Sequence, residues 1–399
     1  MSNHEKMRAE IASREAGWQA LLVRWSEINS GFDHAAGLVR MLDELSHAFS
    51  QLPAKITRLG PGKGALAPDL GIRCRPNAKL QILLSGHYDT VFGANDPFQH
   101  CRPLPGGCLN GPGLADMKGG IAVMLAALTA FETHPAAANI GWEVLLTSDE
   151  ENGSHGSREH LLAAARRHHL GLVFETSPQG DDVVRSRKGT ATLLVTARGR
   201  AAHSSLARIE GRNAVVALAE FLVAAHALNR EIDGIVLNVA NCAGGGAVNV
   251  VPDAARAELH LRCGRRNEGE RAIARLHELA AAIDGRDGFG LRVEGDFNRP
   301  PMEPQPAAAA WTEILQACGR DLGQVIGLRD VNSASDANFF AAAGLPTIDG
   351  LGVDGDELHS DREFYRLASL GRRACLVATF LARLAEGAPS QPALRTLST

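Results

Sequence analysis

Three short apolar stretches of the chain lead directly into residues that can bind metals or move protons. Residues 82–85 precede His87 and Asp89, residues 144–147 precede Glu150 and Glu151, and residues 172–174 precede Glu175. In an open parallel sheet, the crevice beyond the carboxyl ends of the strands is the usual binding site. We therefore expect these side chains to meet at one sheet edge, joined by His359 from the loop after residues 346–348.

A further carboxylate, Asp116, lies in a glycine-rich segment, residues 110–120, just before an expected helix. Glycines allow the backbone to pack closely around such a group. A glycine-rich turn before a helix could instead bind phosphate. However, the chain contains neither G-x-G-x-x-G nor G-x-x-x-x-G-K-[ST], which disfavours that alternative.

Together these side chains form a donor set of imidazoles and carboxylates: His87, Asp116, Glu150, Glu151, Glu175 and His359. Such donors suit Zn²⁺ or a similar divalent ion. They are too many for one closed tetrahedral site, and they suit two ions about 3.5–4 Å apart that share a carboxylate and a water. Each residue taken singly has an ordinary structural explanation, such as a cap, a salt bridge or a solvated face. Their common placement at strand ends favours the metal site.

Composition excludes several other classes of protein. The 399 residues are 45% hydrophobic and 22% charged, which is typical of a globular chain and not of a disordered or coiled-coil one. A net charge of -4 gives no reason to expect nucleic acid as a partner. The seven cysteines include no CxxC pair, so free thiols in a reducing compartment are expected. With no leader-like start and no membrane-length apolar run, we expect a cytoplasmic protein without a membrane partner.

The periodicity of the chain predicts an α/β fold with an insertion. Apolar strands alternating with helices up to about residue 186 indicate a mostly parallel sheet flanked by helices. After that point, residues 256–263 alternate strictly between apolar and polar, which is typical of a sheet with one solvated face. We therefore predict a catalytic domain made of residues 1–186 and 299–399, with a smaller α+β domain, residues 187–298, inserted into it.

The motifs resemble those of a known family. The matching stretches are SGHYDTV, GPGLADMKGG, LLTSDEENGSHGSRE, VFETS, GRAAHSS, NVVPD and ELHSD, in order along nearly the whole chain. The chain is similar to the di-zinc metallopeptidases and amidohydrolases that include glutamate carboxypeptidase, aminoacylase, acetylornithine deacetylase and succinyl-diaminopimelate desuccinylase. The glutamate carboxypeptidase-like branch is the most similar. The resemblance implies a di-zinc exopeptidase-like fold and two divalent ions, Zn²⁺ first, with Co²⁺ or Mn²⁺ suiting the same ligands.

The resemblance also implies the metal ligands. Asp116 would bridge the two ions, with His87 and Glu175 completing one site, and Glu151 and His359 the other.

Two more residues receive roles beside the ligands. Glu150 would be the general base. Asp89, two residues after His87, would accept the other imidazole N–H, because residues i and i+2 of a strand share a face. Glu150 and Glu151 can serve one site only if their strand has already ended, and the following Asn152, Gly153 and Ser154 support that.

The inserted domain resembles the family's lid and dimerisation domain, which implies a homodimer. His203 matches a histidine that reaches into the partner subunit's site as an oxyanion donor, and Asn249 and Arg262 match further substrate contacts. Arg299 matches an arginine that binds the substrate carboxylate, for which a fork of donors is well suited. Alternatively, Arg262 is a solvated side chain and Arg299 a linker residue. The chain departs from close relatives at residues 333–336, where SASD replaces a glycine-rich turn near the substrate.

The sequence thus predicts a metal-dependent hydrolase that cleaves an amide or peptide bond next to a free carboxylate in a small substrate. An N-acyl amino acid deacylase built on the same site is the main alternative. A non-catalytic metal- or peptide-binding protein is a second alternative, although no ligand and no base is missing.

Overall fold

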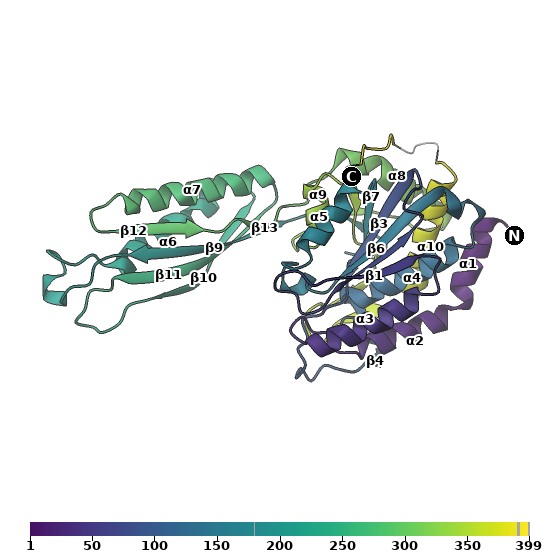
Figure 1. Cartoon of the computed structure of the whole chain (residues 1–399), viewed down its shortest axis with the longest axis horizontal. Coiled ribbons are helices and arrows are strands. Elements are labelled where there is room, and N and C mark those ends of the chain that lie inside the picture. The colour runs from purple at the N-terminus through teal and green to yellow at the C-terminus, as the bar shows by residue number, and fades with distance from the viewer. Residues whose placement is uncertain (179, 389–391, 398–399) are drawn as a thin grey trace. The chain divides into compact units, whose positions relative to one another are not determined.

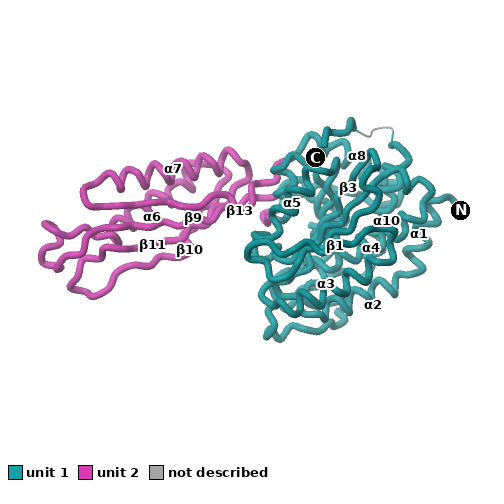
Figure 2. The backbone as a smooth tube through the Cα atoms, viewed as in Figure 1, with its two compact units in different colours: residues 1–186, 304–331, 335–399 teal, residues 187–303, 332–334 magenta. Residues whose placement is uncertain are grey.

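The computed structural model of the protein describes residues 1–178, 180–388 and 392–397, which fold into two compact units. Unit 1 comprises Met1–Ser186, Pro304–Val331 and Ser335–Thr399, and unit 2 comprises Arg187–Glu303 and Asn332–Ala334 (Figure 2). Unit 2 thus extends beyond the expected end at residue 298. The backbones of Arg187 and Met302 exchange hydrogen bonds of 2.9 and 3.1 Å, and Arg262 donates to the carbonyl of Asn332, which ties these segments to unit 2.

Unit 1 is built on a six-stranded mixed sheet (Figure 1). In order across the sheet, its strands are β1 (Lys55–Leu59), β2 (Asp69–Cys74), β6 (Ile140–Thr147), β3 (Leu80–His87), β7 (Leu170–Val173) and β15 (Thr347–Ile348). The last four run parallel to one another, whereas β2 pairs antiparallel with both of its neighbours, β1 and β6. Every residue of β3, β6 and β7 is buried, as expected for central parallel strands. The prediction of an α/β fold with a mostly parallel sheet is confirmed.

Eight α-helices accompany this sheet in the described part of unit 1. They are α1 (Asn3–Ser13), α2 (Glu15–Ser26), α3 (Ala35–Phe49), α4 (Gly119–Phe131), α5 (Arg158–Arg166), α8 (Pro306–Asp321), α9 (Ala337–Ala342) and α10 (Leu367–Ala385). Helix α4 is the central one, since α1, α2 and α10 all pack against it. Among the described residues, one stretch, Leu114–Phe131, has the length and hydropathy of a membrane span. It is 94% buried in the protein, as a core helix is.

Smaller sheets complete unit 1. A four-stranded antiparallel sheet orders β16 (Gly355–Asp356), β17 (Phe364–Arg366), β5 (Cys108–Asn110) and β4 (Arg102–Leu104), and β8 (Val183–Arg187) pairs with β14 (Leu328–Val331). The pairing of β17 with β5 brings the end of the His359 loop beside the segment that leads to Asp116.

Unit 2 is an antiparallel sheet with helices packed against it. The strands are β10 (Ile235–Gly244), β11 (Ala254–Cys263), β9 (Gly189–Arg198) and β12 (Gly290–Glu294), with β13 (Phe297–Arg299) also paired to β9. Helices α6 (Ala214–Glu231) and α7 (Arg266–Asp284) pack on the sheet through its own core of apolar side chains. Within residues 256–263 of β11 the apolar residues are buried and most of the alternating polar ones are exposed, as the period-two pattern predicts.

The start of α4 packs so closely on the end of β7 that Gly120 leaves no room for a side chain. A Cβ atom there would lie 1.9 Å from the carbonyl oxygen of Phe174, the residue before Glu175. We expect Gly120→Ala to lower the free energy of unfolding by about 1–3 kcal/mol through overpacking. Gly17→Ala in α2, with nothing within 4 Å of the added methyl, should instead raise it by up to about 1 kcal/mol. Urea denaturation of both variants measures this, and equal stabilities would contradict it.

Candidate metal and catalytic site

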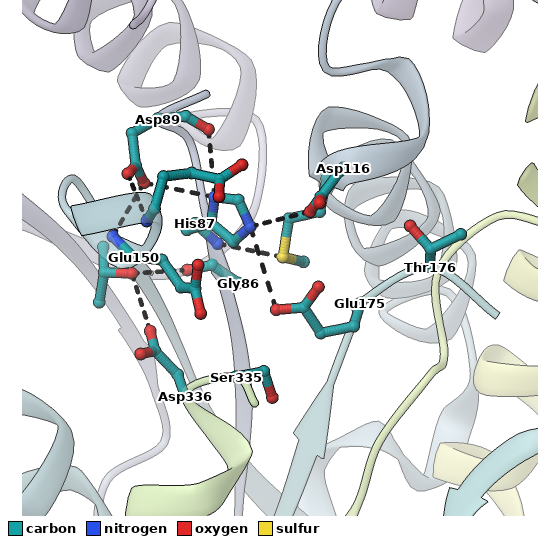
Figure 3. Close-up of polar contacts among 12 residues, drawn as sticks. Gly86, His87, Asp89, Asp116, Glu150, Glu175, Thr176, Ser335 and Asp336 are labelled. Carbon is teal, nitrogen blue, oxygen red and sulfur yellow. Dashed lines mark hydrogen bonds and ion pairs between the residues drawn. The ribbon is translucent and has the colours of Figure 1, made fainter. Parts of the chain in front are cut away.

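His87 is the last residue of β3, and its ring is held on both sides (Figure 3). Its Nδ1 atom lies 3.3 Å from Oδ1 of Asp89 and 3.1 Å from the Asp89 carbonyl oxygen. Its Nε2 atom lies 3.2 Å from Oδ1 of Asp116. Because Asp89 occupies the Nδ1 side, the ring presents Nε2 to Asp116, which is the orientation that a metal-binding histidine needs.

Asp116 contacts both histidines with different oxygens. Oδ1 faces His87, and Oδ2 lies 3.1 Å from Nε2 of His359. The turn that presents this carboxylate begins at Gly113, whose φ of 66° is in the left-handed region that favours glycine. A carboxylate with one oxygen beside each imidazole has the arrangement that a bridging ligand requires.

Two glutamates complete the grouping, one beside each histidine. Oε1 of Glu175 lies 3.9 Å from Nε2 of His87, and Oε2 of Glu151 lies 3.2 Å from Nε2 of His359. One ligand atom each from His87, Asp116 and Glu151 lies within 4.8 Å of the others. The structure therefore brings together all five residues that the sequence proposed as metal ligands.

Glu150 and Glu151 lie on a short turn and not on a strand. Strand β6 ends at Thr147, and residues 150–152 form a single 3₁₀ turn. The two backbone N–H groups of this turn donate to the two carboxylate oxygens of Asp89, at 3.2 and 2.9 Å. Asp89 thus fixes His87 and both glutamates together. Burial lowers the pKa of the His87 imidazole, but hydrogen bonds with Asp116 and Asp89 outweigh it and raise that pKa, and the charge of Glu150 adds to the rise.

The electrostatics of the cluster favour added positive charge. Burial raises the pKa of Glu151 to about 8, helped by the nearby charge of Asp116. Hydrogen bonds with Asp116 and Glu151 raise the pKa of His359 to about 11. For Asp116, contacts with the two histidines outweigh burial and hold its pKa below the usual range. Several carboxylates gathered around two imidazoles make a donor set that fits two divalent cations.

Asp336, the last residue of the SASD turn, supports the turn that carries Glu150 and Glu151, here called the glutamate turn. Its carboxylate accepts hydrogen bonds from Oγ1 of Thr147 at 3.0 Å and from Oγ of Ser154 at 2.5 Å. These residues lie just before and just after the two glutamates. Ser335 is also buried and donates to Asp349 at 3.2 Å. Both residues therefore have supporting contacts within unit 1, whereas Ser333 belongs to unit 2 and bonds Arg187.

The four residues predicted to contact substrate all lie in unit 2. The backbone of Ser204, next to His203, donates to the carbonyl of Asn249 at 2.9 Å, so these two predicted residues are neighbours. Arg262 and Arg299 both pair with Thr190 of β9, from opposite sides of that strand. Arg299 is buried at the end of β13 and is not part of a free linker. Their contacts with substrate stay predictions.

Sequence reasoning missed two buried charged residues that lie beside the site. Lys118 donates from Nζ to the carbonyls of Trp25 at 3.0 Å and Ile28 at 2.9 Å, and burial lowers its pKa to about 7. Burial, with the charge of Asp116, raises the pKa of Glu363 to about 7. Lys118 lies within GPGLADMKGG, and Glu363 lies just after ELHSD, and both stretches match family motifs. Their position in or beside these motifs was the signal that could have identified them.

A second cluster of potential ligands, His4, His134 and Glu386, has a different explanation. The Glu386 carboxylate lies 3.3 Å from Nε2 of each histidine. The backbone N–H of Ala136 donates to Nδ1 of His134 at 3.2 Å, so the neutral ring carries its proton on Nε2. A metal ion would need the lone pair of that same atom. We therefore interpret the cluster as a polar contact that joins α1 to the end of α10.

Comparison with known proteins agrees with this geometry. Residues 83–383 match the family model described as peptidase family M20/M25/M40. Carboxypeptidase G2 from Pseudomonas sp. (strain RS-16) is 25% identical over 367 residues, covering 90% of this chain and 87% of the relative. Succinyl-diaminopimelate desuccinylase from Rhodospirillum rubrum is 30% identical over 364 residues, covering 82% of this chain and 89% of the relative.

Solved structures show the same fold at low sequence identity. Aminopeptidase PepT from Bacillus cereus superposes with a TM-score of 0.74 at 20% identity, covering 95% of this chain and 99% of that one. The YXEP protein of Bacillus subtilis, described as a dinuclear metal binding peptidase from the M20 family, gives a TM-score of 0.70 at 11% identity, covering 94% and 99%. Since the family model spans most of the chain and the fold agrees, this protein belongs to the M20 family of metallopeptidases and related hydrolases.

Proposed function

We propose that this protein is a hydrolase that uses two divalent metal ions to cleave an amide or peptide bond next to a free carboxylate. The observation that carries the proposal is the buried Asp116 carboxylate, which presents one oxygen to His87 and the other to His359. In this assignment His87 and Glu175 hold one ion, and Glu151 and His359 hold the other. Zn²⁺ is the proposed metal, and Co²⁺ or Mn²⁺ would suit similar ligands. The dinuclear metal binding of the Bacillus subtilis relative supports two ions.

The positions of two further residues support roles for them in the reaction. The bound ions would supply Lewis acidity and a lowered pKa for water. Glu150, buried beside His87, takes a proton from the attacking water and returns it to the leaving amine. Asp89 keeps this base aligned with His87, because its carboxylate holds the Glu150 backbone and the imidazole at the same time.

Residues of unit 2 are proposed to bind the substrate. The guanidinium group of Arg299 is suited to its carboxylate, and Asn249 and Arg262 would contribute further polar contacts. His203, which is exposed on its loop, would act as the oxyanion donor for the partner subunit's site. The carboxypeptidase named among the relatives supports a substrate with a free carboxylate.

An N-acyl amino acid deacylase is a second candidate, favoured by the similarity to desuccinylases. Both activities cleave an amide bond and use the same base, so the metal site does not separate them. A panel of dipeptides and N-acyl amino acids, assayed after chelation and restoration of Zn²⁺, Co²⁺ or Mn²⁺, distinguishes the two. Turnover of neither class, or turnover that resists chelation, would argue against the proposal and favour a binding protein.

A homodimer formed through unit 2 is also part of the proposal. Helix α6 exposes Val216 and Val223, seven residues apart on one face, and the edge strand β10 exposes Val236. Apolar side chains that recur on one helix face beside a sheet edge are typical of a buried interface. The seven free cysteines agree with a reducing compartment, and we propose the cytoplasm.

Replacing the proposed base gives the direct test of mechanism. Glu150→Gln removes the proton acceptor and changes no proposed metal ligand. We expect kcat to fall by about 10²–10⁴-fold while two metal ions per chain are retained. Steady-state kinetics and metal analysis measure this, with Glu159→Gln on the exposed face of α5 as the matched control. A metal-loaded Glu150→Gln enzyme that keeps most of its activity would refute the assigned role.

Metal binding should depend on pH in a defined direction. The raised pKa values of His359, about 11, and Glu151, about 8, mean that both groups hold protons in the metal-free protein near neutral pH. A metal ion must displace these protons, so affinity should increase as the pH rises from about 6 to 8, with proton release. Calorimetric titration in two buffers of different ionisation enthalpy detects the released protons. Constant affinity without proton release would contradict the expectation.

The dimer is tested at the exposed face of α6. Val223, with 74% of its surface exposed, is a site where a charge should prevent association and leave the fold unchanged. We expect Val223→Glu to elute as a monomer in size-exclusion chromatography with light scattering, whereas the parent elutes as a dimer. The control is Val325→Glu in unit 1, where the valine is 86% exposed. A monomeric parent protein would disprove this part of the proposal.

A further inference from the structure

Glu363 is a buried carboxylate at the end of an exposed loop. The loop contains His359, four residues earlier, and residues 356–362 are exposed or partly exposed, whereas Glu363 is only 1% exposed. A carboxylate taken out of water needs donors in place of the water that it loses. The identity of those donors indicates what the residue does.

The donors to Glu363 are backbone N–H groups of the turn that carries Asp116. Oε1 accepts from Ala115 at 2.9 Å and from Asp116 itself at 3.1 Å, and Oε2 accepts from Gly113 at 3.2 Å. One carboxylate therefore holds three amides of a turn that lies about 250 residues away in the chain. These bonds orient the peptide from which the Asp116 carboxylate projects.

The backbone of Glu363 is fixed to the same region. Its carbonyl oxygen accepts from Nδ2 of Asn110 at 2.7 Å and from the N–H of Gly111 at 3.2 Å. The next residue, Phe364, pairs with Asn110 where β17 meets β5. Both the side chain and the main chain of Glu363 thus join the His359 loop to the Asp116 turn.

His359 lies on an exposed loop whose other hydrogen bonds are mainly internal, apart from Nδ2 of Asn110, which donates to the carbonyl of Asp361 at 3.1 Å. The φ of His359, 61°, is unusual for a residue other than glycine, and its side chain is 52% exposed. The 3.1 Å contact between Nε2 of His359 and Oδ2 of Asp116 joins two segments that are distant in sequence. Keeping that distance requires a connection between the two backbones.

We infer that Glu363 is a positioning residue that sets the distance between His359 and Asp116. The inference rests on the proposed function, since it assigns both residues to one ion. Glu363 contacts no metal in this scheme and acts through the Asp116 backbone. Loss of its carboxylate would leave three buried amides without their acceptor and would free the His359 loop to move.

The test uses Glu363→Gln and Glu363→Asp in the full-length protein. Glutamine keeps the size of the side chain, but its NH₂ group faces an amide donor. Aspartate keeps the charge and is one methylene shorter. Glu357→Gln is the matched control, because Glu357 lies on the same loop with an exposed carboxylate that contacts Arg362 at 2.9 Å. Hydrogen exchange of the metal-free protein, Zn²⁺ affinity, kcat and KM are measured for each.

We expect Glu363→Gln to remain folded, to exchange faster in peptides covering residues 110–118, and to bind Zn²⁺ about 10–100-fold more weakly. With saturating metal its KM should stay near that of the parent, and the aspartate variant should recover part of the affinity. Unchanged exchange and unchanged affinity in Glu363→Gln would overturn the inference. If that variant does not fold, parent-like exchange and affinity in Glu363→Asp would overturn it. A parent protein that binds no metal would disprove the proposed function, while the exchange measurement would still decide the role of Glu363.

Discussion

The structure of unit 1 depends on holding one buried carboxylate, Asp116, between two imidazoles while other carboxylates lie close by. Like charges in a buried site repel each other strongly and shift one another's pKa values. Burial raises the pKa of Glu151, and the nearby charge of Asp116 adds to the shift. Such a cluster is stable only if positive charge enters it or if the surrounding backbone supplies donors, and this protein shows provision for both.

Backbone N–H groups at the site donate to carboxylates that are placed around it. Asp89 accepts the N–H groups of Glu150 and Glu151, and Glu363 accepts those of the Asp116 turn. Asp336 holds the hydroxyls on both sides of the glutamate turn. Each supporting carboxylate thus orients a segment that carries a proposed ligand or base, and hydrogen bonds to charged acceptors are stronger than neutral ones. The site is preorganised by a shell of fixed acceptors.

The parallel sheet explains how a few segments of the chain bring all the side chains of the site together. Strands β3, β6 and β7 are adjacent and parallel, so their carboxyl ends lie at one edge and deliver His87, the glutamate turn and Glu175 together. Gly120 lets α4 approach the end of β7, which brings the Asp116 turn to the same edge. Membership of the M20 family agrees with this arrangement, and substrate choice would then be decided by side chains outside the metal ligands.

The sequence by itself determined the features that depend on local order. Apolar runs that end in His87, Glu150 and Glu175 predicted the strand ends, and strict alternation through residues 256–263 predicted β11 with one solvated face. Contacts between distant segments were decided only by the tertiary structure. Glu363 and Gly113 are 250 residues apart, and no periodicity relates them. The end of unit 2 at Glu303 likewise agrees with the backbone hydrogen bonds between Arg187 and Met302. The spacing of residues in either segment does not predict such a contact.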